Sequence, residues 1–280
     1  ELVIKPAPEN FGIKFCRVDI DKNDLIPANF NNVIEPILCT KIANTNGISV
    51  STVEHLMAAF FGEGIDNAIV EVNASEIPIL DGSASDFVEA IRSAGIKEQK
   101  TQRQFIKVEK KVEVKEGEKF ISIEPAENDL IIDFEIIYKN PLIRTRRKKF
   151  KLSQDKLTEI YNSRTFCLYE DIEKLKKQNL AQGGSLDNAI VVKNENILNN
   201  EKLRNEKEFV NHKILDCMGD LFLSGYKIIG NLKCSQGGHH LTNELLRKIF
   251  EDKNNYSLIE IKGKQLPYTF GNYYNLKSIA

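Results

Sequence analysis

Hydrophobic residues in the first third of the chain follow two different spacings. They alternate with polar residues in LVIKP, GIKFCRVDI and the stretch around Ile48–Val53, which predicts short strands with one buried face. Residues 52–62 change to helical spacing, with Thr52 or Ser51 as the expected N-cap and a glycine as the stop signal. AIVEV then predicts a strand, and ASDFVEAIRSAGI predicts a helix that ends at Gly95. We therefore expect this third to form a compact α+β unit.

A polar stretch, KEQKTQRQ at residues 97–104, separates that unit from a second strand-rich region. This change predicts an N-terminal domain of residues 1–101 and a C-terminal domain of residues 102–280. FIKVEKKVEV, KFISIEP and LIIDFEIIY predict strands, which are followed by a basic run at residues 144–151 and a helix from about Ser153.

The strongest helical pattern lies in the last third, at residues 208–224, after a polar surface connection at residues 194–208. YKIIGNLKC predicts the next strand, and a helix is expected near residues 241–251. TVEHLMAAFFGEGIDNAIVEV and FVNHKILDCMGDLFLSGYKIIGNL each place a histidine near the start of a helix, followed by glycine and a β-branched strand. This loose similarity predicts a duplicated α+β unit in which each half brings one histidine to a shared interface.

Composition narrows the class of protein. The 280 residues carry a formal net charge of -1, which argues against a general nucleic-acid binder, because that class needs a basic excess. Five dispersed cysteines without a CxxC pair indicate reduced thiols and a cytoplasmic location. No apolar run approaches the ~18–20 residues that cross a bilayer. The chain opens at Glu1 as though already inside a strand, so we expect that an N-terminal segment is missing.

Two of the four histidines lie in patterns that could hold a metal ion. On the helix predicted for FVNHKILDCMGDLFLSG, His212, Asp216 and Asp220 follow at four-residue intervals on a face apart from the apolar stripe. An imidazole and a carboxylate at that spacing suit zinc, although a solvated polar face is the alternative. In VEH, His55 could be a third ligand and Glu54 could reach a water at the metal. The alternative there is an exposed first helical turn.

A third cluster, GGHHLTN at residues 237–243, places His239 directly after two glycines that permit a close backbone approach. A histidine near a metal but not bound to it is a natural proton donor to a leaving amine. Asp220, two turns after His212, could accept its N–H and keep it protonated. The alternative is a turn followed by a histidine at the start of a helix.

Three segments, in the same order, are similar to one known family. VSTVEHLMAAFFGEGIDNAIVEVNASEIPILDGSA, SRTFCLYEDIEKLKKQNLAQGGSLDNAIVV and EFVNHKILDCMGDLFLSGYKIIGNLKCSQGGHHLTN closely resemble the UDP-3-O-acyl-N-acetylglucosamine deacetylases, the zinc enzymes of lipid A synthesis. The resemblance implies an α+β fold of two similar domains, each a small β-sheet layered on helices, with the helices between the sheets. It also implies a small βαβ insert in the second domain, at about residues 167–195, that forms a passage for the acyl chain.

The resemblance implies a metal centre and a pair of proton-transfer groups. Zn²⁺ would be held by His55, His212 and Asp216. The substrate would be UDP-3-O-acyl-N-acetylglucosamine, whose N-acetyl group is released as acetate. Glu54 would act as general base and His239 as general acid, and Asp220 would be the partner of that acid.

The resemblance also implies several substrate contacts. Thr165 would support the oxyanion, Phe166 would line the nucleotide-sugar pocket, and Lys213 would contact the polar end of the substrate. The insert would add Gly183, Gly184 and Ser185.

The chain departs from the family pattern in three places. The opening segment of the family, with its own histidine, is absent from this numbering. Gln236 stands where a basic residue is expected, which puts part of the diphosphate or uridine binding in doubt. His240 directly follows His239, and counting from Gly230 favours His239 as the acid.

Other interpretations remain open at the level of sequence. A zinc amidase for another acetylated sugar is one alternative, and a non-catalytic nucleotide-sugar or acyl-binding protein is another. The basic run at residues 144–151 is a solvated strand end or a patch attracted to phosphates or an anionic membrane. We expect a cytoplasmic monomer without a nucleic-acid partner, and peripheral contact with the inner membrane because the substrate is amphiphilic.

Overall fold

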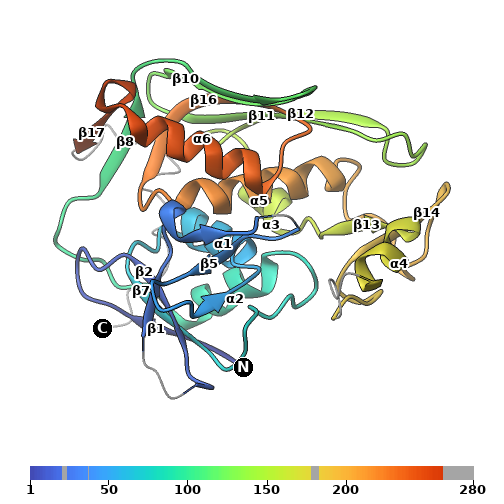
Figure 1. Ribbon diagram of the computed structural model, residues 1–280, viewed down its shortest axis with the longest axis horizontal. Coiled ribbons are helices and arrows are strands. Elements are labelled where there is room, and N and C mark those ends of the chain that lie inside the picture. Colours follow the sequence, from blue (N-terminus) through green and yellow to red (C-terminus); the bar gives the residue numbers. More distant parts are fainter. Residues whose placement is uncertain (21–23, 37, 178–182, 261–280) are drawn as a thin grey trace.

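Figure 1 shows the computed structural model of the chain, which describes residues 1–20, 24–36, 38–177 and 183–260. Two sheets form opposite outer sides, and the longer helices lie between them. The N-terminal sheet has the order β1-β7-β2-β3, and a smaller sheet has the order β4-β5-β6. The strands are β1 (Leu2–Pro6), β2 (Ile13–Arg17), β3 (Leu25–Pro27), β4 (Val33–Ile34), β5 (Lys41–Ala43), β6 (Ser49–Val50) and β7 (Ala68–Val72). The helices of this half are η1 (Phe30–Asn32), α1 (Glu54–Glu63) and α2 (Ser85–Ala94).

The larger sheet, in the second half, has the order β12-β11-β16-β10-β9, and β8 joins β16 to β17. Its strands are β8 (Gln104–Val108), β9 (Val112–Glu116), β10 (Lys119–Glu124), β11 (Leu130–Ile137), β12 (Thr145–Lys151), β16 (Lys227–Ser235) and β17 (Tyr256–Glu260). The accompanying helices are α3 (Leu157–Tyr161), α5 (Glu208–Phe222), α6 (His239–Glu251) and η2 (Lys253–Asn255).

The two halves repeat one topology. The order β1-β7-β2-β3 in the first sheet matches β10-β16-β11-β12 in the second. In both, the strand after the histidine-bearing helix runs antiparallel to one neighbour and parallel to the other. The last strand of each set, β3 or β12, is antiparallel to its partner. The structure therefore confirms an α+β fold of two similar halves, whereas the boundary between residues 101 and 102 stays a prediction.

The two helices that carry His55 and His212 lie at the centre of the molecule. Every residue of α1 is buried, and in α5 only Lys213 is partly exposed. Helices that are buried on all sides lie in the interior of a protein rather than on its surface. The polar side chains of α5 are therefore enclosed between the two sheets, which excludes the alternative of a solvated polar face.

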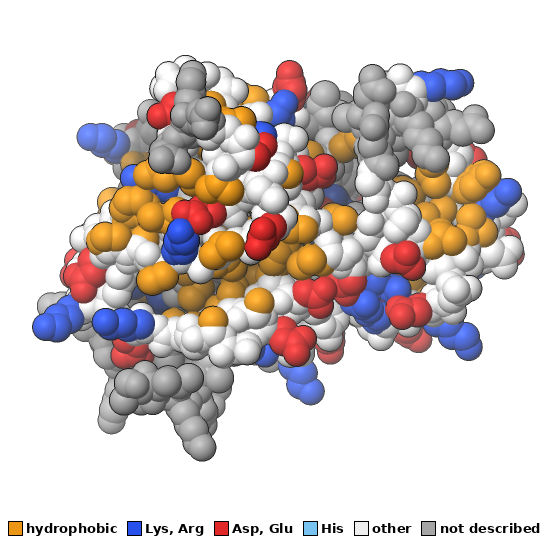
Figure 2. All heavy atoms as spheres, turned by 90° about the horizontal axis from the view of Figure 1, so that it is seen from below, with side chains coloured by type: hydrophobic (Ala, Val, Ile, Leu, Met, Phe, Trp, Pro, Cys, Tyr) orange, Lys and Arg blue, Asp and Glu red, His pale blue; other side chains and the backbone are white. Residues whose placement is uncertain are grey.

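A small three-stranded unit projects from the second half. It consists of β13 (Phe166–Leu168), α4 (Tyr169–Lys177), β14 (Ile190–Lys193) and β15 (Asn196–Ile197), and β13 pairs in parallel with β14. This is a βαβ arrangement, as expected for the insert. Figure 2 shows hydrophobic side chains gathered on this end of the molecule, where the exposed large hydrophobic residues include Tyr169, Leu186 and Leu198.

Some predicted helix starts are wrong. The N-cap of α1 is Val53, which makes no side-chain cap hydrogen bond, so neither Thr52 nor Ser51 caps the helix. The Thr52 hydroxyl donates instead to Glu76 Oε1 at 2.7 Å. The helix expected from about Ser153 begins at Leu157. The helix expected near residues 241–251 is confirmed as α6, which begins at His239. In the described residues, no helix combines the length and apolar character needed to cross a membrane.

Candidate metal centre and active site

The centre of the site is formed where α1 crosses α5. A Cβ atom on Gly219 would lie 2.0 Å from the Glu54 carbonyl oxygen, so a larger residue would separate the two helices. Because glycine lacks that atom, the backbones approach closely. This contact places Glu54 and His55, at the start of α1, beside the polar side chains in the middle of α5.

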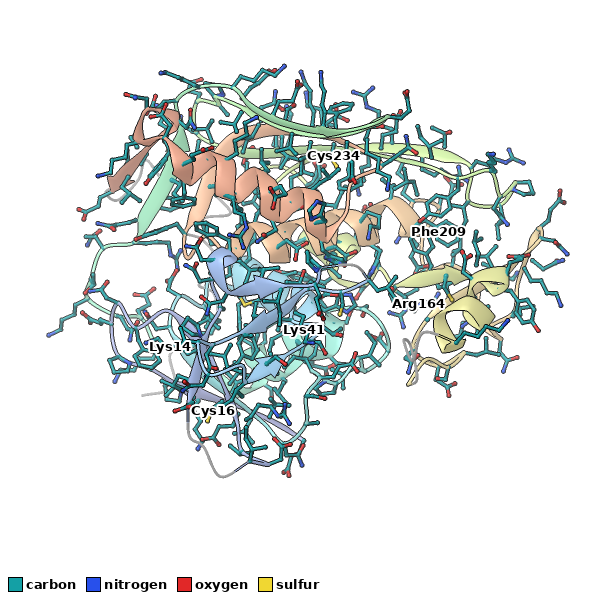
Figure 3. The ribbon with its side chains drawn as sticks, in the orientation of Figure 1. Lys14, Cys16, Lys41, Arg164, Phe209 and Cys234 are labelled. Atoms are coloured by element: carbon teal, nitrogen blue, oxygen red, sulfur yellow. The ribbon has the colours of Figure 1, made fainter. Side chains whose placement is uncertain are left out.

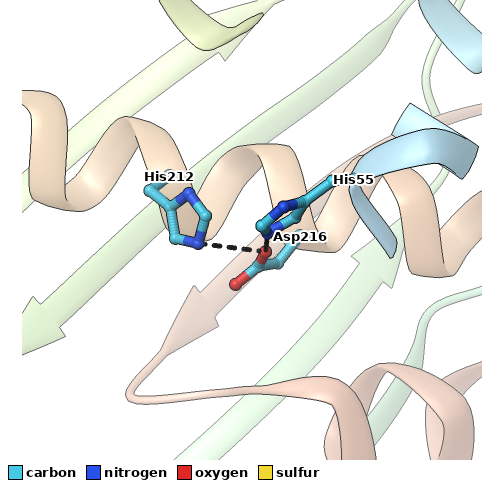
Figure 4. Close-up of side chains that lie close together, drawn as sticks. All are labelled: His55, His212 and Asp216. Atoms are coloured by element: carbon cyan, nitrogen blue, oxygen red, sulfur yellow. Dashed lines mark ion pairs between the residues drawn. The ribbon is translucent and has the colours of Figure 1, made fainter. Parts of the chain in front are cut away.

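Three potential metal ligands meet at this crossing (Figure 4). Asp216 Oδ1 lies 3.5 Å from His55 Nε2 and 3.3 Å from His212 Nε2, and all three side chains are buried. One ligand atom from each residue lies within 4.8 Å of the others. Asp216 Oδ1 is buried and has no hydrogen-bond partner of standard geometry among the residues that the structure describes, as expected of an atom that faces a cation.

The charges of these groups suit metal binding. Burial lowers the pKa of His212 to about 3, so its imidazole is neutral at neutral pH. Burial would raise the pKa of Asp216, but His212 and Lys213 outweigh it and hold that pKa well below its usual value. Deprotonated imidazole and carboxylate are the forms that bind a metal. The His212 ring is also oriented, because its Nδ1 lies 3.0 Å from the Ser163 carbonyl oxygen.

A second cluster of polar side chains lies next to these ligands. His239 Nδ1 is 2.8 Å from Asp220 Oδ2, and His239 Nε2 is 3.8 Å from Glu54 Oε1. Burial would lower the pKa of His239, but the carboxylates of Asp220 and Glu54 outweigh it and raise that pKa to about 9. Burial raises the pKa of Glu54 above its ordinary value. The structure thus places His239 in the site, whereas His240 is exposed.

Lys213 lies at the edge of the ligand cluster. Its Nζ donates to Asp216 Oδ2 at 2.6 Å, which leaves Oδ1 directed at the two imidazoles. Burial would lower the pKa of this lysine, but Asp216 outweighs it and raises the pKa above its usual value. The ammonium group is therefore a fixed positive charge beside the potential metal ligands.

The segment from Ser163 to Phe166 connects the site to the insert. Arg164 forms a buried ion pair with Glu208 at 2.9 Å, and Figure 3 shows Arg164 and Phe209 where the insert joins the body. Thr165 is held through its backbone, since its N–H donates to Gly82 O at 2.7 Å and its carbonyl accepts from Ile190 N at 2.8 Å.

Phe166 lies beside one of the potential metal ligands. The centroid of its ring is 4.9 Å from that of Phe209 and 6.4 Å from that of His212. Tyr138 completes this aromatic group, with 5.6 Å between its ring centroid and that of Phe166. An aromatic surface therefore adjoins the imidazole of His212.

The structure does not bring every predicted site residue to the centre. Gly183, Gly184 and Ser185 are exposed, and the hydrogen bonds described for them stay within the insert, with Asp187 and Asn188 as partners. Leu186 beside them is also exposed. Their contact with substrate therefore stays a prediction.

One residue of the site, Thr40, is not marked by any pattern in the sequence. Thr40 donates through its backbone N–H to Glu54 Oε2 at 3.0 Å and through its hydroxyl to Asp220 Oδ1 at 2.5 Å. It lies just before a three-residue strand, and its partner Asp220 is 180 positions away, so no local spacing marks it. Cys39, its neighbour, is a thiol whose pKa burial raises to about 11, which makes it a poor nucleophile at neutral pH.

The site combines two buried imidazoles and a carboxylate with a further carboxylate and a protonated imidazole beside them. This combination defines the catalytic centre of a metal-dependent hydrolase. Comparison with known proteins narrows this class. The family model described as UDP-3-O-acyl N-acetylglycosamine deacetylase matches residues 1–251, and the chain belongs to this family.

Several relatives agree with that assignment. The UDP-3-O-acyl-N-acetylglucosamine deacetylase of Photobacterium profundum is 41% identical over 272 residues, which cover 96% of this chain and 89% of the relative. The protein of the same name from Actinobacillus succinogenes is 44% identical over 267 residues, covering 94% of this chain and 87% of the relative. That from Psychrobacter sp. is 44% identical over 263 residues, covering 93% and 88%.

Proposed function

We propose that the chain hydrolyses the N-acetyl group of UDP-3-O-acyl-N-acetylglucosamine, in lipid A biosynthesis, to give acetate and the free 2-amino sugar. Membership of the deacetylase family supports this reaction. The single observation that carries it is the buried cluster of His55, His212 and Asp216, with Glu54 and His239 next to it. Amide hydrolysis needs an activated water and a proton for the departing amine, and this cluster holds groups suited to both tasks.

Zinc is the metal that we propose for the three ligands. Two neutral imidazole nitrogens and one carboxylate oxygen are a common ligand set for catalytic zinc, which keeps a further position open. The unpartnered Oδ1 of Asp216 and the orientation of His212 by Ser163 support this choice. When bound, zinc lowers the pKa of a coordinated water and polarises the acetamide carbonyl.

Glu54 is the proposed general base. Its carboxylate is buried beside the metal ligands and accepts a hydrogen bond from Thr40 N, which fixes Oε2 and leaves Oε1 toward His239. Burial raises its pKa, which makes the carboxylate a stronger base than a solvated glutamate. It takes a proton from the attacking water.

His239 is the proposed general acid, with Asp220 as the partner that holds it. Nδ1 donates to Asp220, so Nε2 is the nitrogen that delivers a proton to the amine of the sugar. Without that proton the amine is a poor leaving group, because it would depart as an amide anion. The raised pKa keeps the imidazole protonated until this step.

The substrate contacts in this proposal extend from the metal ligands into the insert. Thr165 supports the developing oxyanion, Phe166 lines the sugar pocket, and Lys213 contacts the polar end. The fixed backbone of Thr165 and the position of Phe166 beside His212 support these roles. We propose that the βαβ unit, with Gly183, Gly184 and Ser185, borders the acyl chain, which the exposed hydrophobic side chains on that unit support.

The proposal also covers location and assembly. An enzyme of this reaction meets a substrate with a fatty acyl chain and a charged nucleotide, so we place it in the cytoplasm as a monomer that touches the inner membrane at its periphery. The basic strand β12 is a suitable surface, although part of its charge is neutralised, since Arg147 pairs with Asp133 at 2.7 Å.

Acetate release tests the proposed function. The zinc-loaded protein is expected to release one acetate per UDP-3-O-acyl-N-acetylglucosamine, and a chelator should abolish the release. Glu54→Gln should keep the metal but lose activity on the order of 10²–10⁴-fold, the range for a general base. Undiminished turnover in that metal-loaded variant would show that Glu54 is not the base. No acetate release from the zinc-loaded protein would favour a binding protein, and equal release from a sugar without the acyl chain would favour another amidase.

A further inference from the structure

Thr40 lies between the two proton-transfer groups. It is the residue just before β5, whose first residue, Lys41, is labelled in Figure 3. Its side chain is buried, with 1% of the residue exposed. All of its polar groups take part in hydrogen bonds, because the carbonyl oxygen also accepts from Val53 N at 3.3 Å. That last contact ties Thr40 to the N-cap of the helix that carries Glu54.

The two donors of Thr40 point to different partners. The backbone N–H bonds Glu54 Oε2 at 3.0 Å, and the hydroxyl bonds Asp220 Oδ1 at 2.5 Å. Asp220 uses its other oxygen for His239, and the Thr40 hydroxyl oxygen itself lies 3.1 Å from His239 Nδ1. One residue therefore touches the base, the acid and the carboxylate that holds the acid.

This geometry matters because the two proton transfers must share one substrate. The base takes a proton from the water that attacks the acetamide carbon, and the acid delivers a proton to the departing amine nitrogen. The distance between base and acid therefore decides whether both can reach these atoms in one bound substrate. Errors of ~1 Å in such positions are costly for catalysis. A buried carboxylate is costly without hydrogen-bond donors, and Thr40 supplies one donor to Glu54 and one to Asp220.

We propose that Thr40 is a positioning residue that fixes Glu54 and the Asp220–His239 pair relative to each other. This inference rests on the proposed roles of Glu54 and His239. Thr40 itself needs no contact with substrate or metal. Its hydroxyl acts through Asp220, and its backbone N–H, which a side-chain substitution keeps, acts on Glu54.

The test compares Thr40→Val with Thr40→Ser in the zinc-loaded enzyme. Valine keeps the shape and removes the hydroxyl, so kcat should fall on the order of 10–100-fold, as for other residues that orient active-site groups. KM should change by less than about twofold, because ground-state binding does not use this contact. Serine restores the hydroxyl and should recover most of kcat. A kcat unchanged in Thr40→Val, or a loss that appears in KM alone, would overturn the proposal.

Thr52→Val is the matched control for loss of structure. Thr52 lies just before α1, and its hydroxyl, like that of Thr40, bonds a carboxylate, in this case that of Glu76. In the described residues it makes no hydrogen bond to Glu54, Asp220 or His239. Its kcat should stay near that of the wild type even if its melting temperature falls. If the two variants lose kcat in equal proportion, Thr40 supports the fold alone and the inference fails.

A double-mutant cycle shows whether Thr40 acts through Asp220. Thr40→Val should lower kcat by less than about threefold in the Asp220→Ala background, because the partner of the hydroxyl is already gone. If the losses in kcat from the two substitutions multiply in full, the proposal is contradicted.

These variants also distinguish a failure of this proposal from a failure of the proposed function. If His239→Ala and Glu54→Gln are impaired while Thr40→Val is not, only the role of Thr40 fails, whereas wild-type activity in those two variants would refute the proton-transfer roles themselves.

Discussion

The imidazole of His239 meets a carboxylate on each side of its ring. Asp220 lies 2.8 Å from Nδ1, and Glu54 lies 3.8 Å from Nε2. These two negative charges outweigh burial and raise its pKa to about 9. The same residue therefore stays protonated in the pH range where Glu54 is ionised, which is the combination that an acid and a base need to work in one turnover.

Alanine substitutions of the two adjacent histidines should have very different effects. His239→Ala is expected to lower the rate of acetate release on the order of 10²-fold or more, since the leaving amine loses its proton donor. His240→Ala should change the rate by less than about twofold, because the side chain is exposed and outside the cluster. Metal content and circular dichroism serve as controls. The reverse order of effects would assign the acid to His240.

The alkaline limit of activity should follow the pKa of His239. An acid must be protonated to act, so kcat/KM should fall as pH rises through about 9, rather than through the ordinary histidine value of 6.5. Asp220→Asn removes one of the charges that raise this pKa, so its alkaline limit should move to lower pH. A pH profile of acetate release for the two proteins measures the shift. If the alkaline limit of Asp220→Asn does not move, His239 is not the group whose deprotonation ends activity at high pH.

The sequence reveals some of these residues and hides others for a physical reason. His212 and Asp216 are four positions apart on one helix, so the helical repeat alone brings them to one face. His55 needs the packing of α1 on α5, which family resemblance supplies and spacing does not. Thr40 meets His239 across 199 positions, and only tertiary structure can predict such a contact.

At the scale of elements, the crossing of α1 and α5 determines the geometry of the centre. The two helices are buried throughout, and Gly219 is the position where their backbones come closest. Sequence spacing predicted both helices but not this contact. Glycine inside a helix normally destabilises the helix, whereas here it permits the close approach of the Glu54 backbone.

Gly219→Ala should therefore destabilise the protein and impair catalysis together. Alanine stabilises a helix relative to glycine by about 1 kcal/mol. Any loss of stability in this variant therefore comes from the disturbed packing of the two helices. With a Cβ placed 2.0 Å from the Glu54 carbonyl oxygen, we expect about 1–3 kcal/mol of lost unfolding free energy. Urea denaturation measures it, with the volume-conserving Met218→Leu as control. A more stable Gly219→Ala protein with full activity would show that this contact is not needed.

Across the whole molecule, the repeated strand order explains how one site draws on both halves. Each half supplies one central helix, α1 or α5, followed by a strand that is parallel to one neighbour and antiparallel to the other. Facing each other between the two sheets, these helices bring His55 from one half to His212 and Asp216 from the other. The loose sequence similarity predicted the duplication, but the matching strand order follows from backbone pairing that residue patterns do not record.

Because the three potential ligands come from both halves and meet at one point, metal binding tests how the two halves are arranged. The most direct measurement is the rate of acetate release as zinc is added back to metal-free protein. We expect activity to rise in proportion to zinc and to level off at one equivalent, with His212→Ala and Asp216→Ala failing to retain the ion. Full turnover in the metal-free protein, or one tightly held zinc in both variants, would contradict the proposal that His55, His212 and Asp216 hold a catalytic zinc.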